Sequence, residues 1–265
     1  MKLSLKDGIT SFELKILGII LMTFDHLGAF LVLQTPVWFG WLGRPVATIF
    51  LFTSAQGYHY TKNKKKYLLR LLIGFWIMNL FNFMFSKFLP VEGVELYANI
   101  FGTIFLGVLA MYLYDIVKNS IKSKTYKNII FVIIFVVGLF ALSFMIPTLM
   151  SVNLTLGALI FNIIPTPLFV EGGVVYIVMA LLFYIFIDNK KAQMLVILLF
   201  SALFLASGLS AGNIFTSNYQ WMAVFSIIPI YLYNGEKGKS LKYFFYVYYI
   251  SHIMVIYLAS YFISK

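Results

Sequence analysis

Residues 16–34 have the sequence ILGIILMTFDHLGAFLVLQ, and the only ionisable side chains in this run are Asp25 and His26. As a helix, this run would extend about 28 Å at 1.5 Å per residue, close to the hydrocarbon thickness of a bilayer. It has no small-x-small cleavage site at its end, and the polar pair interrupts the apolar region that a signal peptide would need. The stretch therefore predicts a retained first membrane helix.

The rest of the chain has the same apolar character. Of its 265 residues, 62% are hydrophobic and 11% are charged, and the mean hydropathy is +0.92. Soluble domains carry about 25% charged residues, so this chain has too little polar surface to cover a water-facing globule. No stretch is polar enough for a separate soluble domain. We therefore expect residues 1–265 to form a single membrane domain whose first partner is the lipid bilayer.

Eight further apolar runs follow the first, and most have the roughly 17–25 residues that a spanning helix needs. The stretch 147–170 is also apolar, but it contains Pro165 and Pro167, and a Pro-x-Pro pair interrupts a spanning helix. We interpret this stretch as an outer-face loop or a re-entrant segment. The eight runs are 44–60, 67–86, 97–117, 128–146, 173–187, 192–210, 219–233 and 243–263.

The basic residues are distributed unevenly between the two sets of loops. If the N-terminus is inside, 17 of the 20 Lys and Arg residues lie inside, and the exceptions are Arg44, Lys87 and Lys265. The positive-inside rule predicts such a distribution. One more span at 147–170 would move the later basic loops to the outside and remove this asymmetry. The net charge of +11 therefore reflects topology and not nucleic-acid binding. The predicted fold is an all-α, polytopic transmembrane helical bundle of about nine spans with its N-terminus inside.

Three polar side chains are expected near the midplane of the membrane. Asp25 and His26 lie about ten residues into the first helix, and His252 lies about nine residues into the last. A carboxylate in hydrocarbon must be neutralised or find a cation, and the candidates are both histidines, Arg44 and Arg70. Because neighbouring side chains diverge on a helix, a partner from another helix is favoured over His26.

These residues have a structural and a chemical interpretation. An intramembrane histidine can hold helices together, Arg44 can extend to the headgroups, and Arg70 can be a topology signal. A carboxylate near a histidine can instead orient the ring and prepare a general base. The chain has three histidines and no cysteine, so we expect neither a thiolate nucleophile nor a metal site.

Two blocks of sequence resemble the TraX family of bacterial membrane proteins, which is named for the N-terminal acetylation of conjugative pilin. The blocks cover about the first 75 and the last 25 residues. In the second block, Ile250 stands where the family often has proline, two residues before the histidine. The residues that carry the resemblance are LMTFDHLG at 21–28, WLGRP at 41–45, IFLF at 49–52, Gly57, Thr61, Tyr67, RLL at 70–72 and KYFFYVYYISH at 242–252.

This resemblance implies a membrane acyltransferase in the bacterial cytoplasmic membrane. Such an enzyme would take an acetyl group from cytoplasmic acetyl-CoA and place it on an extracytoplasmic acceptor, either a peptide amine or a glycan hydroxyl. By resemblance, His26 would be the catalytic base, and Asp25 and His252 would complete the catalytic set. Arg44 would hold an anionic group or Asp25 itself. The other cations implied in binding the CoA phosphates are Arg70, Lys65 and Lys66.

Two other functions fit the residues. A proton-coupled transporter could use Asp25 and the histidines as a relay, and a non-catalytic envelope assembly protein could use them to hold helices together. Many transporters have inverted repeats with paired broken helices, and this sequence has no evident repeat. The acyltransferase is favoured mainly by the family resemblance.

Overall fold

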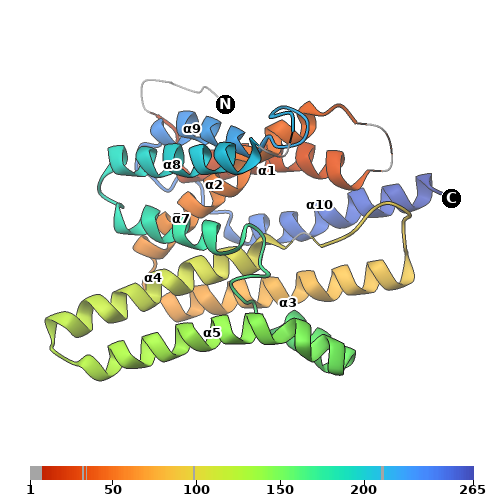
Figure 1. Cartoon of the computed structure of the whole chain (residues 1–265). Coiled ribbons are helices and arrows are strands. Elements are labelled where there is room, and N and C mark those ends of the chain that lie inside the picture. The colour runs from red at the N-terminus through yellow and green to blue at the C-terminus, as the bar shows by residue number, and fades with distance from the viewer. Residues whose placement is uncertain (1–7, 32, 34, 98, 210–211) are drawn as a thin grey trace. The chain divides into compact units, whose positions relative to one another are not determined.

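The computed structural model describes residues 8–31, 33, 35–97, 99–209 and 212–265, and within them it is helical apart from loops and one isolated bridge between Ile9 and Tyr233 (Figure 1). The prediction of an all-α fold is confirmed. The helices are α1 (Ser11–Phe30), α2 (Trp38–Tyr60), α3 (Lys64–Phe88), α4 (Ile100–Lys122), α5 (Tyr126–Val152), α6 (Leu154–Ile163), α7 (Gly173–Ile185), α8 (Lys190–Gly208), the 3-10 helix η1 (Gln220–Ser226), α9 (Ile227–Tyr231) and α10 (Lys242–Ile263).

Five of the described helices are long and apolar enough to cross a membrane: α3, α4, α5, α8 and α10. By comparison, α1 has 20 residues but carries three charged ones, and α7 has only 13 residues. A 13-residue helix is about 20 Å long, short of the roughly 30 Å of hydrocarbon. The chain is thus a helical membrane protein, while nine spans with the N-terminus inside stay a prediction.

The chain divides into two compact units. Unit 1 contains Met1–Thr53, Met84–Leu96 and Phe186–Lys265, and unit 2 contains Ser54–Phe83 and Tyr97–Ile185. Helices α2 and α3 each contribute one part to each unit, so the division does not cut the chain into two consecutive domains. A single domain over 1–265 stays a prediction.

Within unit 1, α1 and α10 lie side by side and run in the same direction (Figure 1). Next to the start of α1, the backbone N–H of Ile9 donates to the carbonyl of Leu232 over 2.9 Å, in the segment that leads to α10. At their other ends, the Ser260 hydroxyl donates to the Phe30 carbonyl over 2.5 Å. If both helices span the membrane, their shared direction requires an odd number of spans in total, which agrees with the parity predicted from the basic residues.

In unit 2, the interpretation of a loop beginning at Pro147 is wrong. Helix α5 continues through this proline to Val152, and the short α6 then packs back against α5. A proline costs only a local backbone bond, which membrane helices tolerate when the freed carbonyl is satisfied elsewhere. The non-helical part is 164–172, which contains Pro165 and Pro167. The helix is therefore interrupted at the Pro-x-Pro pair, as predicted from the sequence. The hairpin of α5 and α6 is compatible with the re-entrant alternative.

Candidate functional site

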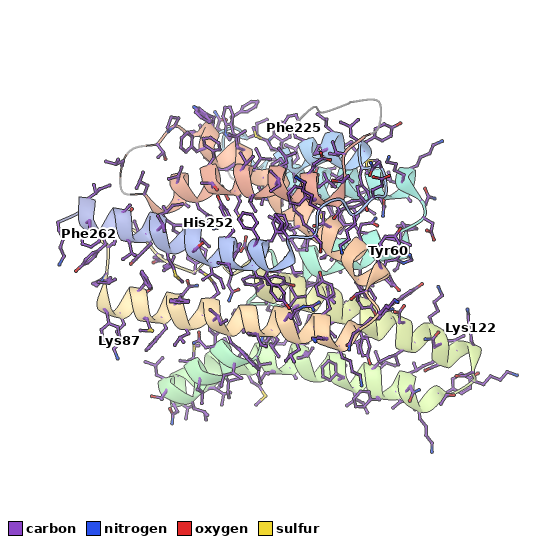
Figure 2. The ribbon with its side chains drawn as sticks, turned by 180° about the vertical axis from the view of Figure 1, so that it is seen from behind. Tyr60, Lys87, Lys122, Phe225, His252 and Phe262 are labelled. Carbon is purple, nitrogen blue, oxygen red and sulfur yellow. The ribbon has the colours of Figure 1, made fainter. Side chains whose placement is uncertain are left out.

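The two histidines expected at similar depth meet each other in unit 1. His26 Nδ1 lies 2.7 Å from His252 Nε2, and the two ring planes are inclined by 17° with their centroids 4.9 Å apart. Figure 2 labels His252 near the middle of α10, on the helix that runs beside α1. His252 is only 8% exposed, whereas His26 is half-buried. Residues 226 positions apart in the sequence thus form one hydrogen-bonded pair.

The hydrogen bonds assign the proton positions in the neutral pair. His252 Nδ1 lies 2.7 Å from the carbonyl oxygen of Tyr248, which can only accept, so this nitrogen carries the proton. His252 Nε2 is then an acceptor, and His26 Nδ1 must donate to it. The lone pair of His26 therefore lies on Nε2, which has no hydrogen-bond partner among the described residues. A nitrogen with this lone pair can act as a general base.

Neighbouring side chains hold His252 in this orientation. The Tyr248 ring stacks on the His252 ring with centroids 5.1 Å apart. The Thr23 hydroxyl donates to the Ile19 carbonyl over 2.7 Å and so must accept from the Tyr248 hydroxyl, also over 2.7 Å. This contact ties α10 to α1 one turn before the histidine pair. The pair is thus oriented from both helices, as a pre-organised catalytic group requires.

The cationic partner of Asp25 is Arg44, one of the candidates from the sequence. Arg44 Nη2 donates to Asp25 Oδ1 over 2.5 Å, and the two side chains are 24% and 22% exposed, respectively. The same guanidinium donates to the Gly40 carbonyl and to Gln220 Oε1, each over 2.9 Å. Its face also lies over the Tyr219 ring, 5.2 Å from the centroid. Arg44 therefore joins α1, α2 and the start of η1.

Two glycines of α2 make this close approach possible. A Cβ added at Gly43 would lie 2.1 Å from Asp25 Cγ, and one added at Gly40 would lie 2.7 Å from the Tyr219 hydroxyl. Real Cβ atoms do not approach other atoms so closely, so no side chain larger than hydrogen fits at Gly43 without moving the carboxylate. Since Asp25 points at α2 and His26 points at α10, the ion pair also sets the rotation of α1 that brings the histidines together.

The ion pair predicts a non-additive response to mutation. Arg44→Gln leaves Asp25 without its cation, and we expect the free energy of unfolding to fall by about 1–3 kcal/mol. Asp25→Asn should cost less, because Arg44 keeps its bonds to Gly40 and Gln220. The double variant should recover part of the loss, with a coupling energy of about 0.5–3 kcal/mol. Unfolding of the four proteins in detergent measures this coupling, and simple addition of the two single costs would contradict it.

The remaining predicted site residues lie in unit 2, on the first two turns of α3. Lys65 and Lys66 are exposed, and the Arg70 guanidinium lies over the Tyr67 ring, 5.7 Å from its centroid. Arg70 Nε is buried and has no hydrogen-bond partner among the described residues. Of the four candidate partners of Asp25, the one with which it pairs is Arg44, also in unit 1. These three cations thus form a group of their own.

A second ion pair, which the sequence analysis did not find, lies beside them. Asp115 of α4 accepts from Lys64 Nζ over 2.5 Å and from the Tyr58 hydroxyl over 2.8 Å through Oδ2, and from the Tyr184 hydroxyl over 2.7 Å through Oδ1. We call Tyr58, Lys64, Asp115 and Tyr184 the Asp115 cluster. It joins α2, α3, α4 and α7 within unit 2. The signal in the sequence was a lone carboxylate inside the apolar run 97–117.

Other site residues that sequence reasoning missed could not have been found locally. Gln220 and Tyr219 hold the Arg44 guanidinium, and Tyr248 orients His252, but each is a common residue in an apolar context. Within the part of the chain that the structure describes, no three His, Asp or Glu side chains group as metal ligands.

Comparison with known proteins gives one match. No curated protein and no solved structure matches the chain significantly. The sequence profile of a family described as TraX protein matches residues 11–162, a stretch that contains Asp25, His26, Arg44 and Asp115 but ends before His252. This match covers more than half of the 265 residues, and the chain therefore belongs to the TraX family.

Proposed function

We propose that this protein is a membrane acyltransferase that moves an acetyl group from cytoplasmic acetyl-CoA to an extracytoplasmic amine or hydroxyl. The observation that carries the proposal is the hydrogen-bonded histidine pair, whose tautomers leave a lone pair on His26 Nε2. Membership of the TraX family, whose name is connected with pilin acetylation, supports acetyl transfer. The apolar helices support a site within the membrane.

In the proposed reaction, His26 Nε2 takes a proton from the acceptor N–H or O–H. The acceptor atom then forms a bond to the acetyl carbonyl carbon, and the carbon–sulfur bond of the thioester breaks. The proton on His26 passes to the departing thiolate, so the products are the acetylated acceptor and CoA. His252 stabilises the transient imidazolium, because His26 Nδ1–H donates to its Nε2 over 2.7 Å.

Asp25 and Arg44 are positioning residues in this proposal. Their ion pair and the bonds of Arg44 to Gly40 and Gln220 hold α1 and α2 in register. The donor side of the reaction needs cations for the CoA phosphates, and unit 2 supplies Lys65, Lys66 and Arg70. Guanidinium and ammonium groups suit phosphate oxygens, to which they donate charge-assisted hydrogen bonds.

The proposal predicts acetyl transfer that depends on the side of the membrane. Inverted vesicles that contain the protein expose its cytoplasmic face and should incorporate label from acetyl-labelled acetyl-CoA into envelope material. Right-side-out vesicles should not, because CoA does not cross the bilayer. Vesicles without the protein are the control. Absence of label above this control, with envelope extract enclosed in the vesicle lumen as acceptor, would remove the acyltransferase function.

The histidine pair also suits a proton relay, because two imidazoles in contact can pass a proton between them. The same vesicles separate this alternative from acyl transfer. A proton flux that needs the protein but not acetyl-CoA would support a transporter. Neither label nor flux would leave the assembly function, in which the polar contacts only hold helices together.

A further inference from the structure

Eight of the sixteen lysines predicted on the cytoplasmic side fall in unit 2, where few carboxylates are present to neutralise them. Unit 2 contains nine Lys and Arg residues but only two carboxylates, Asp115 and Glu171. Within the described residues, the one ion pair that a unit 2 cation forms is Lys64–Asp115. Since Asp115 is neutralised by Lys64, the neighbouring cations leave a positive surplus at this end of the unit.

Aromatic rings lie among these cations. In the Asp115 cluster, the Tyr58 and Tyr184 rings meet edge to face with centroids 5.0 Å apart, and Lys64 Nζ lies 4.3 Å from the Tyr58 centroid. The Tyr114 ring extends this group, 6.2 Å from Tyr184, and Lys118 Nζ lies 5.9 Å from its centroid. Rings interleaved with cations suit a ligand that combines a flat base with phosphates.

An unpartnered donor lies farther along α3. Arg70 Nε is buried and has no acceptor among the described residues, and its guanidinium lies over Tyr67. Tyr67 in turn contacts α2, since a Cβ added at Gly57 would lie 3.4 Å from its hydroxyl. Arg70 lies six residues beyond Lys64, about 9 Å along the helix. A buried N–H without an acceptor is costly, and an anionic oxygen would satisfy it.

We propose that this end of unit 2 binds the 3′-phosphoadenosine diphosphate end of the CoA donor, an inference that rests on the proposed function. The partly exposed Tyr114 and Tyr184 rings take the adenine, whereas the Tyr58 ring is fully buried. Lys65, Lys66 and Lys118 take the 3′-phosphate and the diphosphate, and Arg70 takes the oxygen nearest the pantetheine arm. Asp115 is a positioning residue that fixes the turn between α2 and α3 through Lys64.

Anionic lipid headgroups share the phosphate chemistry but carry no base. The binding experiment therefore uses the full chain in discs of zwitterionic phosphatidylcholine, with adenosine 3′,5′-bisphosphate as the probe and adenosine 5′-monophosphate as its comparison. We expect the bisphosphate to bind at least about tenfold more tightly, because it presents a second phosphate to the lysines. Calorimetric titration measures both dissociation constants.

Matched lysine variants test the location. The triple variant Lys65→Gln, Lys66→Gln, Lys118→Gln should weaken bisphosphate binding by about 10–100-fold. The control removes the same charge from the next basic turn, with Lys122→Gln, Lys124→Gln and Lys127→Gln, and should weaken it by less than about threefold. Equal losses in the two triple variants would overturn the proposal, because the basic face would then act only through its general charge. Stabilisation by phosphatidylglycerol discs, but not by the bisphosphate, would overturn it in favour of a lipid.

The role of Asp115 is tested by separating KM from kcat. Asp115→Asn should raise KM for acetyl-CoA by about 3–10-fold with kcat unchanged. With S-acetylpantetheine, which lacks the nucleotide, the variant should match wild type. Acetyl transfer with an unchanged KM in the Lys65, Lys66 and Lys118 triple variant would overturn this inference and leave the proposed function standing. Bisphosphate binding without any acetyl transfer would instead contradict the proposed function and leave the binding of the nucleotide end standing.

Discussion

Replacement of His26 is expected to reduce kcat for acetyl transfer by about 10²–10⁴-fold, the usual contribution of a general base. The loss follows from the lone pair on Nε2, which the hydrogen bonds of the histidine pair leave pointing away from His252. Release of free CoA thiol from acetyl-CoA by purified protein measures the rate, with envelope extract as the source of acceptor.

Two variants separate the chemistry from the fold. His26→Ala leaves His252 Nε2 without its donor, so it should lose stability as well as activity. His26→Gln keeps an N–H that can reach His252 but has no basic nitrogen, so it should be equally inactive and closer to wild type in thermal stability. His59→Ala, the third histidine and an exposed one, is the matched control and should change the rate less than about twofold. Full activity of a folded His26→Gln protein would exclude His26 as the base.

Gly43→Ala is expected to produce a large loss of stability from a single added methyl group. The added Cβ would lie 2.1 Å from Asp25 Cγ and 2.5 Å from Asp25 Cβ, so the carboxylate cannot stay beside Arg44. Because the change overpacks the contact and breaks a partly buried ion pair, the free energy of unfolding should fall by about 2–4 kcal/mol. Thermal unfolding should show a Tm lower by about 5–10 °C. Acetyl transfer should fall as well, because α1 loses the contact that sets its rotation.

The control for this variant is Gly138→Ala in α5, where an added Cβ meets nothing within 4 Å. Alanine is the better helix former by about 1 kcal/mol, so this change should leave the Tm unchanged or raise it slightly. In an Asp25→Gly background, Gly43→Ala should cost little more, since all three atoms with which the added Cβ would clash are gone. If Gly43→Ala were as stable as Gly138→Ala, the close packing of Asp25 on α2 would be wrong.

The structure departs from the sequence-based helix boundaries where tertiary packing overrides a local signal. Pro147 is a helix breaker by rule, yet α5 continues for five more residues, and α6 then packs back on α5 with Gly157 close to Met150. The run 219–233 was expected to be a span, but it forms a 3-10 helix and a short α-helix. In both places the course of the backbone depends on neighbouring segments that local propensity does not include.

The chemistry of the site was partly predictable. Asp25 had to find a cation, and its neighbour His26 could not supply one because adjacent side chains diverge on a helix. The choice of Arg44 over Arg70 and the contact of His26 with His252 could not be derived in the same way. The pairing of Asp115 was not predicted, because this residue lies near the end of its apolar run and the lysines that follow it are typical of topology signals.

By itself, the sequence determined that the chain is a helical membrane protein, because hydrocarbon forces each apolar segment to satisfy its own backbone hydrogen bonds as a helix. It also determined that Asp25 needs a partner, because an isolated carboxylate is too costly in lipid. Only the tertiary structure decided which side chains meet. The rotation of each helix depends on close approaches such as Gly43 to Asp25, and these join residues far apart in the sequence, so no local pattern specifies them.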